Sequence, residues 1–161
     1  METQYNRYRR RTNYYETDKM GIVHHSNYIR YFEEARLNWL EQIGLEYGRL
    51  EEMGIMIPVM FVNCQYLRPL RFGDEIEIQV KLARFDGIKM EYSYELYRKE
   101  TGELCTTGHT GHCFLDDGMK PLRMKKRFPE LYHAMQMALE RDGGTGKKGL
   151  GHQKEKGMHD L

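Results

Sequence analysis

The sequence has few cysteines, few prolines and no long hydrophobic run. Only three of its 161 residues are cysteine and four are proline. Three widely spaced cysteines argue against a disulfide framework and favour a reducing, cytoplasmic compartment. The basic first residues lack the apolar stretch of a signal peptide. The longest apolar run, residues 55–62, contains Pro58, so we expect neither a signal peptide nor a membrane span.

The sequence also has no excess of charge of one sign. Lys and Arg number 25 against 24 Asp and Glu, a net charge of +1. This balance argues against a nucleic-acid partner, which usually requires a basic surface. Hydrophobic residues make up 40% of the chain, which is enough for one core. We expect residues 1–140 to form a single domain and residues 141–161, rich in glycine and lysine, to form a disordered tail.

Two segments alternate between apolar and polar residues with the period of a half-buried strand. The apolar positions are Ile76, Ile78, Val80 and Leu82 in the first, and Met90, Tyr92, Tyr94 and Leu96 in the second. Asp86-Gly87 between them favours a hairpin turn. We therefore predict an antiparallel meander of four strands, with a further strand near the start of the chain. The predicted ranges are 57–67, 76–82, 90–96 and 103–115 for the meander and 5–15 for the extra strand.

Residues 27–43 change to the spacing of a helix. Their apolar stripe consists of Tyr28, Tyr31, Phe32, Ala35, Trp39, Leu40 and Ile43. Ser26 is a candidate N-cap, and Gly44 marks the end of the helix. Shorter helices are expected at 45–53 and 130–140. One apolar helix stripe and one apolar sheet face predict an α+β architecture in which the long helix lies across the concave side of an antiparallel sheet.

The densest group of reactive side chains lies just before this helix. The unpaired N–H groups near His25 and Ser26, at the positive end of the helix dipole, can polarise a carbonyl or hold an oxyanion. Gly21 allows a sharp turn that brings the Asp18 carboxylate within reach of the helix start. A carboxylate facing an oxyanion hole suits acyl transfer or hydrolysis.

Structural roles compete with this interpretation. Taken alone, Asp18 is typical of a carboxylate that caps a turn, and Ser26 of a helix cap rather than a nucleophile. His24 and His25 are neighbours in an extended segment and point in opposite directions, which disfavours a metal site with Asp18. Alternation along a strand also argues against a zinc site built from Cys105, His109, His112 and Cys113.

The run at residues 15–36 is Y-E-T-D-K-M-G-I-V-H-H-S-N-Y-I-R-Y-F-E-E-A-R. It closely resembles the signature of 4-hydroxybenzoyl-CoA thioesterase-like hotdog-fold proteins, including the small bacterial acyl-CoA thioesterases. The resemblance extends more loosely over P-V-M-F-V-N-C-Q-Y-L-R-P-L-R-F-G-D-E-I at 58–76 and G-E-L-C-T-T-G-H-T-G-H-C-F-L at 102–115. It implies a hotdog fold, with the sheet wrapped around the long helix. It also implies homodimers joined edge to edge, often paired into homotetramers, with active sites at the dimer interface.

The resemblance further implies an activity and its residues. Asp18 of the D-x-x-G motif becomes the catalytic carboxylate, either as nucleophile or as general base toward water, and His25 supplies the oxyanion-hole amide. The remaining substrate-binding positions are Gly21, Val23, His24, Ser26 and Asn27. His at position 25 is typical of the acyl-CoA branch, so we expect an acyl-CoA thioesterase without metal or other cofactor. A non-hydrolytic acyl-CoA or acyl-carrier scaffold and a hotdog dehydratase remain alternatives.

An acyl-CoA substrate also requires cations for its phosphates. The candidates are Arg68, Arg71, Arg84, Lys89 and Arg123. No motif distinguishes any of them from an ordinary surface cation.

Overall fold

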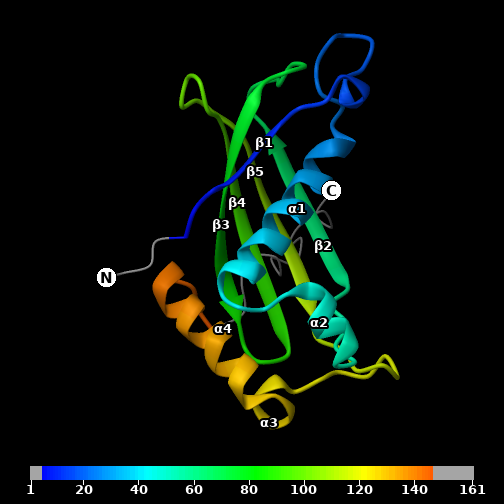
Figure 1. Ribbon diagram of the computed structural model, residues 1–161, viewed down its shortest axis with the longest axis vertical. Coiled ribbons are helices and arrows are strands. Elements are labelled where there is room, and N and C mark those ends of the chain that lie inside the picture. The colour runs from blue at the N-terminus through cyan, green and yellow to red at the C-terminus, as the bar shows by residue number, and fades with distance from the viewer. Residues whose placement is uncertain (1–4, 147–161) are drawn as a thin grey trace, which may run out of the picture.

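The computed structural model, which describes residues 5–146, has the predicted α+β architecture (Figure 1). Its strands are β1 (Tyr8–Arg11), β2 (Val59–Tyr66), β3 (Glu75–Phe85), β4 (Lys89–Arg98) and β5 (Leu104–Cys113). Its helices are α1 (Ser26–Gln42), α2 (Tyr47–Glu52), α3 (Met124–Arg127) and α4 (Pro129–Asp142), with a 3-10 turn, η1, at Tyr14–Glu16. All strand pairs in the sheet are antiparallel.

Helix α1 lies across one face of the sheet (Figure 1) and buries the predicted stripe except Ile43, which follows the helix and is half-buried. Phe32 is fully buried and stacks on Tyr94 of β4, with ring centroids 4.5 Å apart. Gly108 of β5 permits this close approach, because a Cβ there would stand only 2.8 Å from Phe32 Cζ. The absence of a side chain at this position therefore sets how near α1 comes to the sheet.

The predicted meander is wrong for its first strand. The sheet order is β1-β3-β4-β5-β2, so β2 lies beside β5 and not beside β3. The outer edge of β3 is occupied by β1 over four residues, from Tyr8 opposite Ile78 to Arg11 opposite Glu75. Alternation of apolar residues indicates which face of a strand is buried, but it does not indicate which strand lies next to it.

The outer edge of β2 is unpaired within the described part of the chain. Leu67 N–H donates to Cys105 O of β5 over 2.8 Å. Since N–H and C=O groups alternate between the two sides of a strand, those of Val62, Cys64 and Tyr66 face outward. Such an edge can pair with another strand.

The ends of the chain differ from the predicted ranges. β1 is shorter than the predicted strand at 5–15, because η1 follows it, and the short helix α3 was not predicted. The predicted tail begins at residue 141, yet α4 continues to Asp142, and Asp142 Oδ2 accepts the Leu82 N–H at 2.9 Å. The remainder of that tail, residues 147–161, lies outside the described residues, so its disorder stays a prediction. None of the helices described has the length and apolarity needed to cross a membrane.

Candidate active site

A tight hairpin connects η1 to α1 and carries Asp18 and Gly21. Thr17 and Val23 form an antiparallel bridge, and Asp18 N–H donates to Ile22 O over 2.9 Å. Gly21 has a φ of +76°, a left-handed conformation that side chains other than glycine rarely adopt. The hairpin also binds the rest of the fold, because the N–H of buried Val23 donates to Leu70 O over 2.7 Å.

The Asp18 carboxylate is half-buried in this hairpin. One oxygen, Oδ1, accepts the Met20 N–H at 2.8 Å and therefore caps the turn. Among the described residues, Oδ2 accepts no hydrogen bond, and no hydrogen bond joins the carboxylate to His24 or His25. The structural role that the sequence suggested is thus filled by one oxygen, which leaves the other available to a ligand or water.

Helix α1 begins one residue earlier than predicted, at Ser26, with His25 as the N-cap. The first N–H groups of α1 are largely occupied: Ser26 N–H donates to His24 Nδ1 at 3.2 Å, and Asn27 N–H to His24 O at 3.0 Å. The His25 N–H has no acceptor within residues 5–146. It is therefore a free donor at the positive end of a helix of 17 residues.

The prediction that Ser26 caps the helix is wrong. Ser26 is the first helical residue, and its hydroxyl lies 2.8 Å from His24 Nδ1 instead of bonding a backbone N–H of the first turn. The His24 imidazole caps the helix instead, because its Nδ1 accepts the Ser26 N–H. An imidazole in this role is not among the usual capping side chains, so the pattern before the helix did not reveal it.

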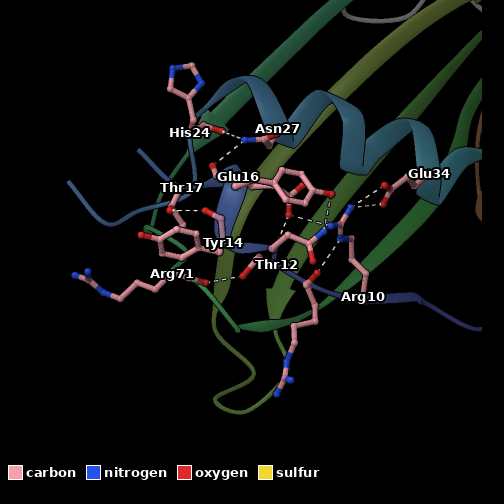
Figure 2. Close-up of polar contacts among 12 residues, drawn as sticks. Arg10, Thr12, Tyr14, Glu16, Thr17, His24, Asn27, Glu34 and Arg71 are labelled. Carbon is pink, nitrogen blue, oxygen red and sulfur yellow. Dashed lines mark hydrogen bonds and ion pairs between the residues drawn. The ribbon is translucent and has the colours of Figure 1, made fainter. Parts of the chain in front are cut away.

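A cluster of ion pairs around the buried Glu16 lies next to the hairpin (Figure 2). Glu16 is 5% exposed, and its Oε1 accepts from Arg10 Nη2 at 2.9 Å and from Asn13 N–H at 2.6 Å. Arg10 also binds Glu34 of α1 through Nη1 at 2.7 and 2.8 Å. Burial and the Glu16 carboxylate raise the pKa of Tyr31, which faces the same cluster. The cluster joins β1, η1 and α1.

Asn27 connects this cluster to the helix start. Its side chain is buried, and Nδ2 donates to Glu16 O at 2.9 Å and to His24 O at 3.3 Å. Glu16 O also accepts the His24 N–H at 2.8 Å. Through Nδ2, Asn27 thus holds the start of α1 against η1 (Figure 2).

Tyr66 and Arg10 are site residues that were not predicted from the sequence. Tyr66, the last residue of β2, donates its hydroxyl to His25 O at 3.1 Å. Partial burial, followed by Cys64 beside it, raises the pKa of Tyr66 to about 12, so the hydroxyl keeps its proton and remains a donor at neutral pH. No sequence signal marks these two residues, because Tyr66 reaches the helix start from β2 and Arg10 acts on it through Glu16.

The candidate CoA-binding cations are scattered. Arg68 pairs with Glu103 at 3.2 Å, and Arg84 with Asp86 at 3.0 Å. The remaining three, Arg71, Lys89 and Arg123, have no carboxylate within 4.0 Å in the described chain. Only Arg71 adjoins the hairpin, through an antiparallel bridge with Ile22.

The residues considered as metal ligands do not lie close together. His109 is exposed on one face of β5, whereas His112 is buried on the other. Over residues 5–146, no group of three or more His, Cys, Asp or Glu side chains is arranged to hold a metal ion.

A hotdog-type sheet and helix, with a free amide at the helix start and a carboxylate on the preceding hairpin, define a candidate thioesterase site. The family model of the thioesterase-like superfamily matches residues 12–137. The chain belongs to this superfamily, and its fold is the predicted hotdog fold.

Individual relatives carry related names. The Bacillus subtilis (strain 168) protein named "Putative acyl-CoA thioesterase YneP" is 32% identical over 126 residues, 78% of this chain and 91% of the relative. The acyl-CoA thioester hydrolase YbgC of Escherichia coli O6:H1 is 26% identical over 117 residues, 73% and 84% of the two chains. The solved structure of the DHNA-CoA thioesterase from Staphylococcus aureus superposes with a TM-score of 0.80 at 30% identity, covering 88% of this chain and 98% of that one.

We predict that the two carboxylates that bind Arg10 contribute unequally to the stability of the fold. The Glu16 side chain is 6% exposed and the Glu34 side chain 40%. Glu16→Gln should lower the free energy of unfolding by about 2 kcal/mol or more, because it removes the more deeply buried of the two counter-charges of Arg10. The matched change Glu34→Gln should cost less than about 1 kcal/mol. Urea unfolding at pH 7 measures both, and equal losses would contradict the burial argument.

Proposed function

We propose that the protein is an acyl-CoA thioesterase, which hydrolyses an acyl-CoA to a free acid and CoA. The observation that carries this proposal is the His25 N–H at the start of α1, which has no acceptor in residues 5–146. The thioesterase-like family and the relatives named as acyl-CoA thioester hydrolases support the substrate class. A developing oxyanion needs such a donor, already oriented before the reaction.

In the proposed mechanism the thioester carbonyl oxygen accepts the His25 N–H. Asp18 removes a proton from water while the water oxygen bonds to the carbonyl carbon, and the carbonyl electron pair moves onto oxygen. The tetrahedral intermediate then breaks its C–S bond, releasing the acyl group as a carboxylic acid and CoA as a thiolate that takes the proton from Asp18. Alternatively, Asp18 attacks the carbonyl itself, and water hydrolyses the resulting anhydride. In both routes Asp18 Oδ2 is the reacting oxygen, because Oδ1 caps the turn.

We further propose that two chains pair through the outward edge of β2. Val59, Met60, Tyr66 and Leu67 are 51%, 60%, 48% and 51% exposed. A strand with both an open edge and exposed apolar side chains favours a partner strand. A second copy fits because two identical edges related by a two-fold axis pair antiparallel with each other. The resulting homodimer places Tyr66, and with it the start of α1, at the interface.

The oxyanion donor can be tested by deleting the His25 N–H. His25 has a φ of −55°, close to the value that proline requires, and proline is tolerated at the start of a helix. His25→Pro should lower kcat by about 100-fold or more because it deletes the N–H. The control His25→Ala keeps the N–H and should lose far less. Equal kcat values for the two variants would exclude the amide as the oxyanion donor.

Asp18 is tested against a carboxylate with the same local role. Asp18→Asn should reduce release of free thiol from a panel of acyl-CoAs by about 100-fold or more. Asp116 makes a good control, since its Oδ1 also caps a turn, accepting Gly118 N–H at 2.9 Å and Lys120 N–H at 3.0 Å. Asp116→Asn should hydrolyse normally. Binding of acyl-CoA without thiol release by the wild type would support the scaffold alternative instead.

The proposed β2 pairing predicts which substitution separates the subunits. Val62→Pro removes an outward N–H without breaking a bond to β5. Sedimentation equilibrium should give twice the chain mass of 19.3 kDa for the wild type and a single chain mass for Val62→Pro. Val62→Ala keeps the N–H and should stay dimeric. A dimeric Val62→Pro protein with a native circular dichroism spectrum would place the interface elsewhere.

A further inference from the structure

A second functional feature is a cavity of about 240 Å³ between α1, α2 and the start of β2. Its walls are mainly apolar and come from Leu37, Leu40, Pro58, Val59 and Met90. Arg36 contributes a guanidinium to the same lining. The cavity therefore combines an apolar space with a single cationic group.

Arg36 is half-buried and lacks a carboxylate partner. Its Nη1 donates to Tyr94 Oη at 3.1 Å, the one hydrogen bond that this side chain makes to described residues. No described carboxylate lies within 4.0 Å of the guanidinium. Glu33 also lines the cavity but is exposed, so water weakens its interaction with Arg36. A half-buried arginine with donors left over suits an oxygen acceptor from a ligand.

The groups behind Arg36 hold it in place without neutralising it. Tyr94 Oη lies 2.6 Å from Thr110 Oγ1, which lies 2.8 Å from His112 Nε2. Burial raises the pKa of Tyr94, so this hydroxyl stays protonated. Burial, followed by the charge of Arg36, lowers the pKa of His112 to about 3, so this imidazole stays neutral. The network thus contributes no negative charge, and the guanidinium keeps its full charge toward the cavity.

The proposed β2 pairing brings this cavity to the thioester. In one chain, His25 and Arg36 are separated by a rise of about 16 Å along α1, too far for a short acyl group. An antiparallel pairing centred on β2 sets Tyr66 of one chain against the segment Pro58–Met60 in the other. Tyr66 bonds the carbonyl of His25, and Pro58 and Val59 line the cavity. The cavity of each subunit then adjoins the His25 amide of its partner.

We infer that Arg36 recognises an oxygen at the far end of the acyl group, and that the preferred acyl group is short and ends in a carboxylate. This inference rests on the proposed thioesterase activity and on the β2 pairing. Arg36 is then a specificity-determining residue that touches the substrate away from the reacting carbonyl. The apolar walls contact the methylene groups between the two ends.

Two acyl-CoAs of equal chain length test the inference, adipoyl-CoA with a terminal carboxylate and hexanoyl-CoA with a terminal methyl. The wild type should favour adipoyl-CoA in kcat/KM by about 10- to 100-fold, the range that hydrogen bonds to charged groups span. Arg36→Met should abolish or reverse this preference, with hexanoyl-CoA hydrolysis retained. The control Arg30→Met removes an exposed arginine of the same helix and should keep the wild-type preference.

The ratio of the two rates does not depend on how much of a variant folds, because both substrates meet the same preparation. Equal kcat/KM values in the wild type, or a preference for hexanoyl-CoA, would overturn the role of Arg36 and leave the thioesterase proposal standing. Hydrolysis of no acyl-CoA at all would instead overturn the proposed function. If Arg36→Met lowers both rates equally and sediments as a monomer, Arg36 holds the subunits together and does not select the acyl group.

Discussion

The candidate site depends on one buried residue, Glu16, whose backbone and side chain hold three segments together. Its carbonyl accepts from His24 N–H and from Asn27 Nδ2, at 2.8 and 2.9 Å. Its carboxylate accepts from Arg10 and Asn13. A buried carboxylate is tolerated only when such partners satisfy it. The hairpin with Asp18 and the start of α1 are therefore held in one arrangement.

The same hydrogen bonds decide which amide is left for chemistry. A helix start has several N–H groups without intrahelical acceptors. Here His24 takes two of them, those of Ser26 and Asn27, through its imidazole and its carbonyl. The His25 N–H remains, and Tyr66 from β2 holds the carbonyl of the same residue. Because β2 is an edge strand of the sheet, assembly and catalysis share this end of the strand in the proposed dimer.

Much of the fold could be predicted from the sequence. The helix stripe at residues 27–43 and the two alternating segments around Val80 and Tyr94 correspond to α1, β3 and β4 within a few residues. The position of β2 in the sheet could not be predicted, because its neighbour depends on β1 occupying the edge of β3. Within the site, Asp18 and His25 were identified through a motif. Tyr66 lies 41 residues from His25 in the chain, and Arg10 acts through Glu16, so no local pattern connects either of them to the helix start.

Periodicity, turn residues and the run at residues 15–36 by themselves determined the α+β class, the long helix and the family, because these features are local in the chain. Only the tertiary structure decided which amide is free, that Asp18 Oδ1 caps a turn while Oδ2 does not, and that Arg36 faces a cavity without a counter-charge. The bonds to the Met20, Ser26 and Asn27 N–H groups span only two or three residues, but contacts between segments far apart in sequence, such as Val23 N–H to Leu70 O, hold the loop that makes them. Such contacts form only when the chain packs, and a local sequence pattern does not predict them.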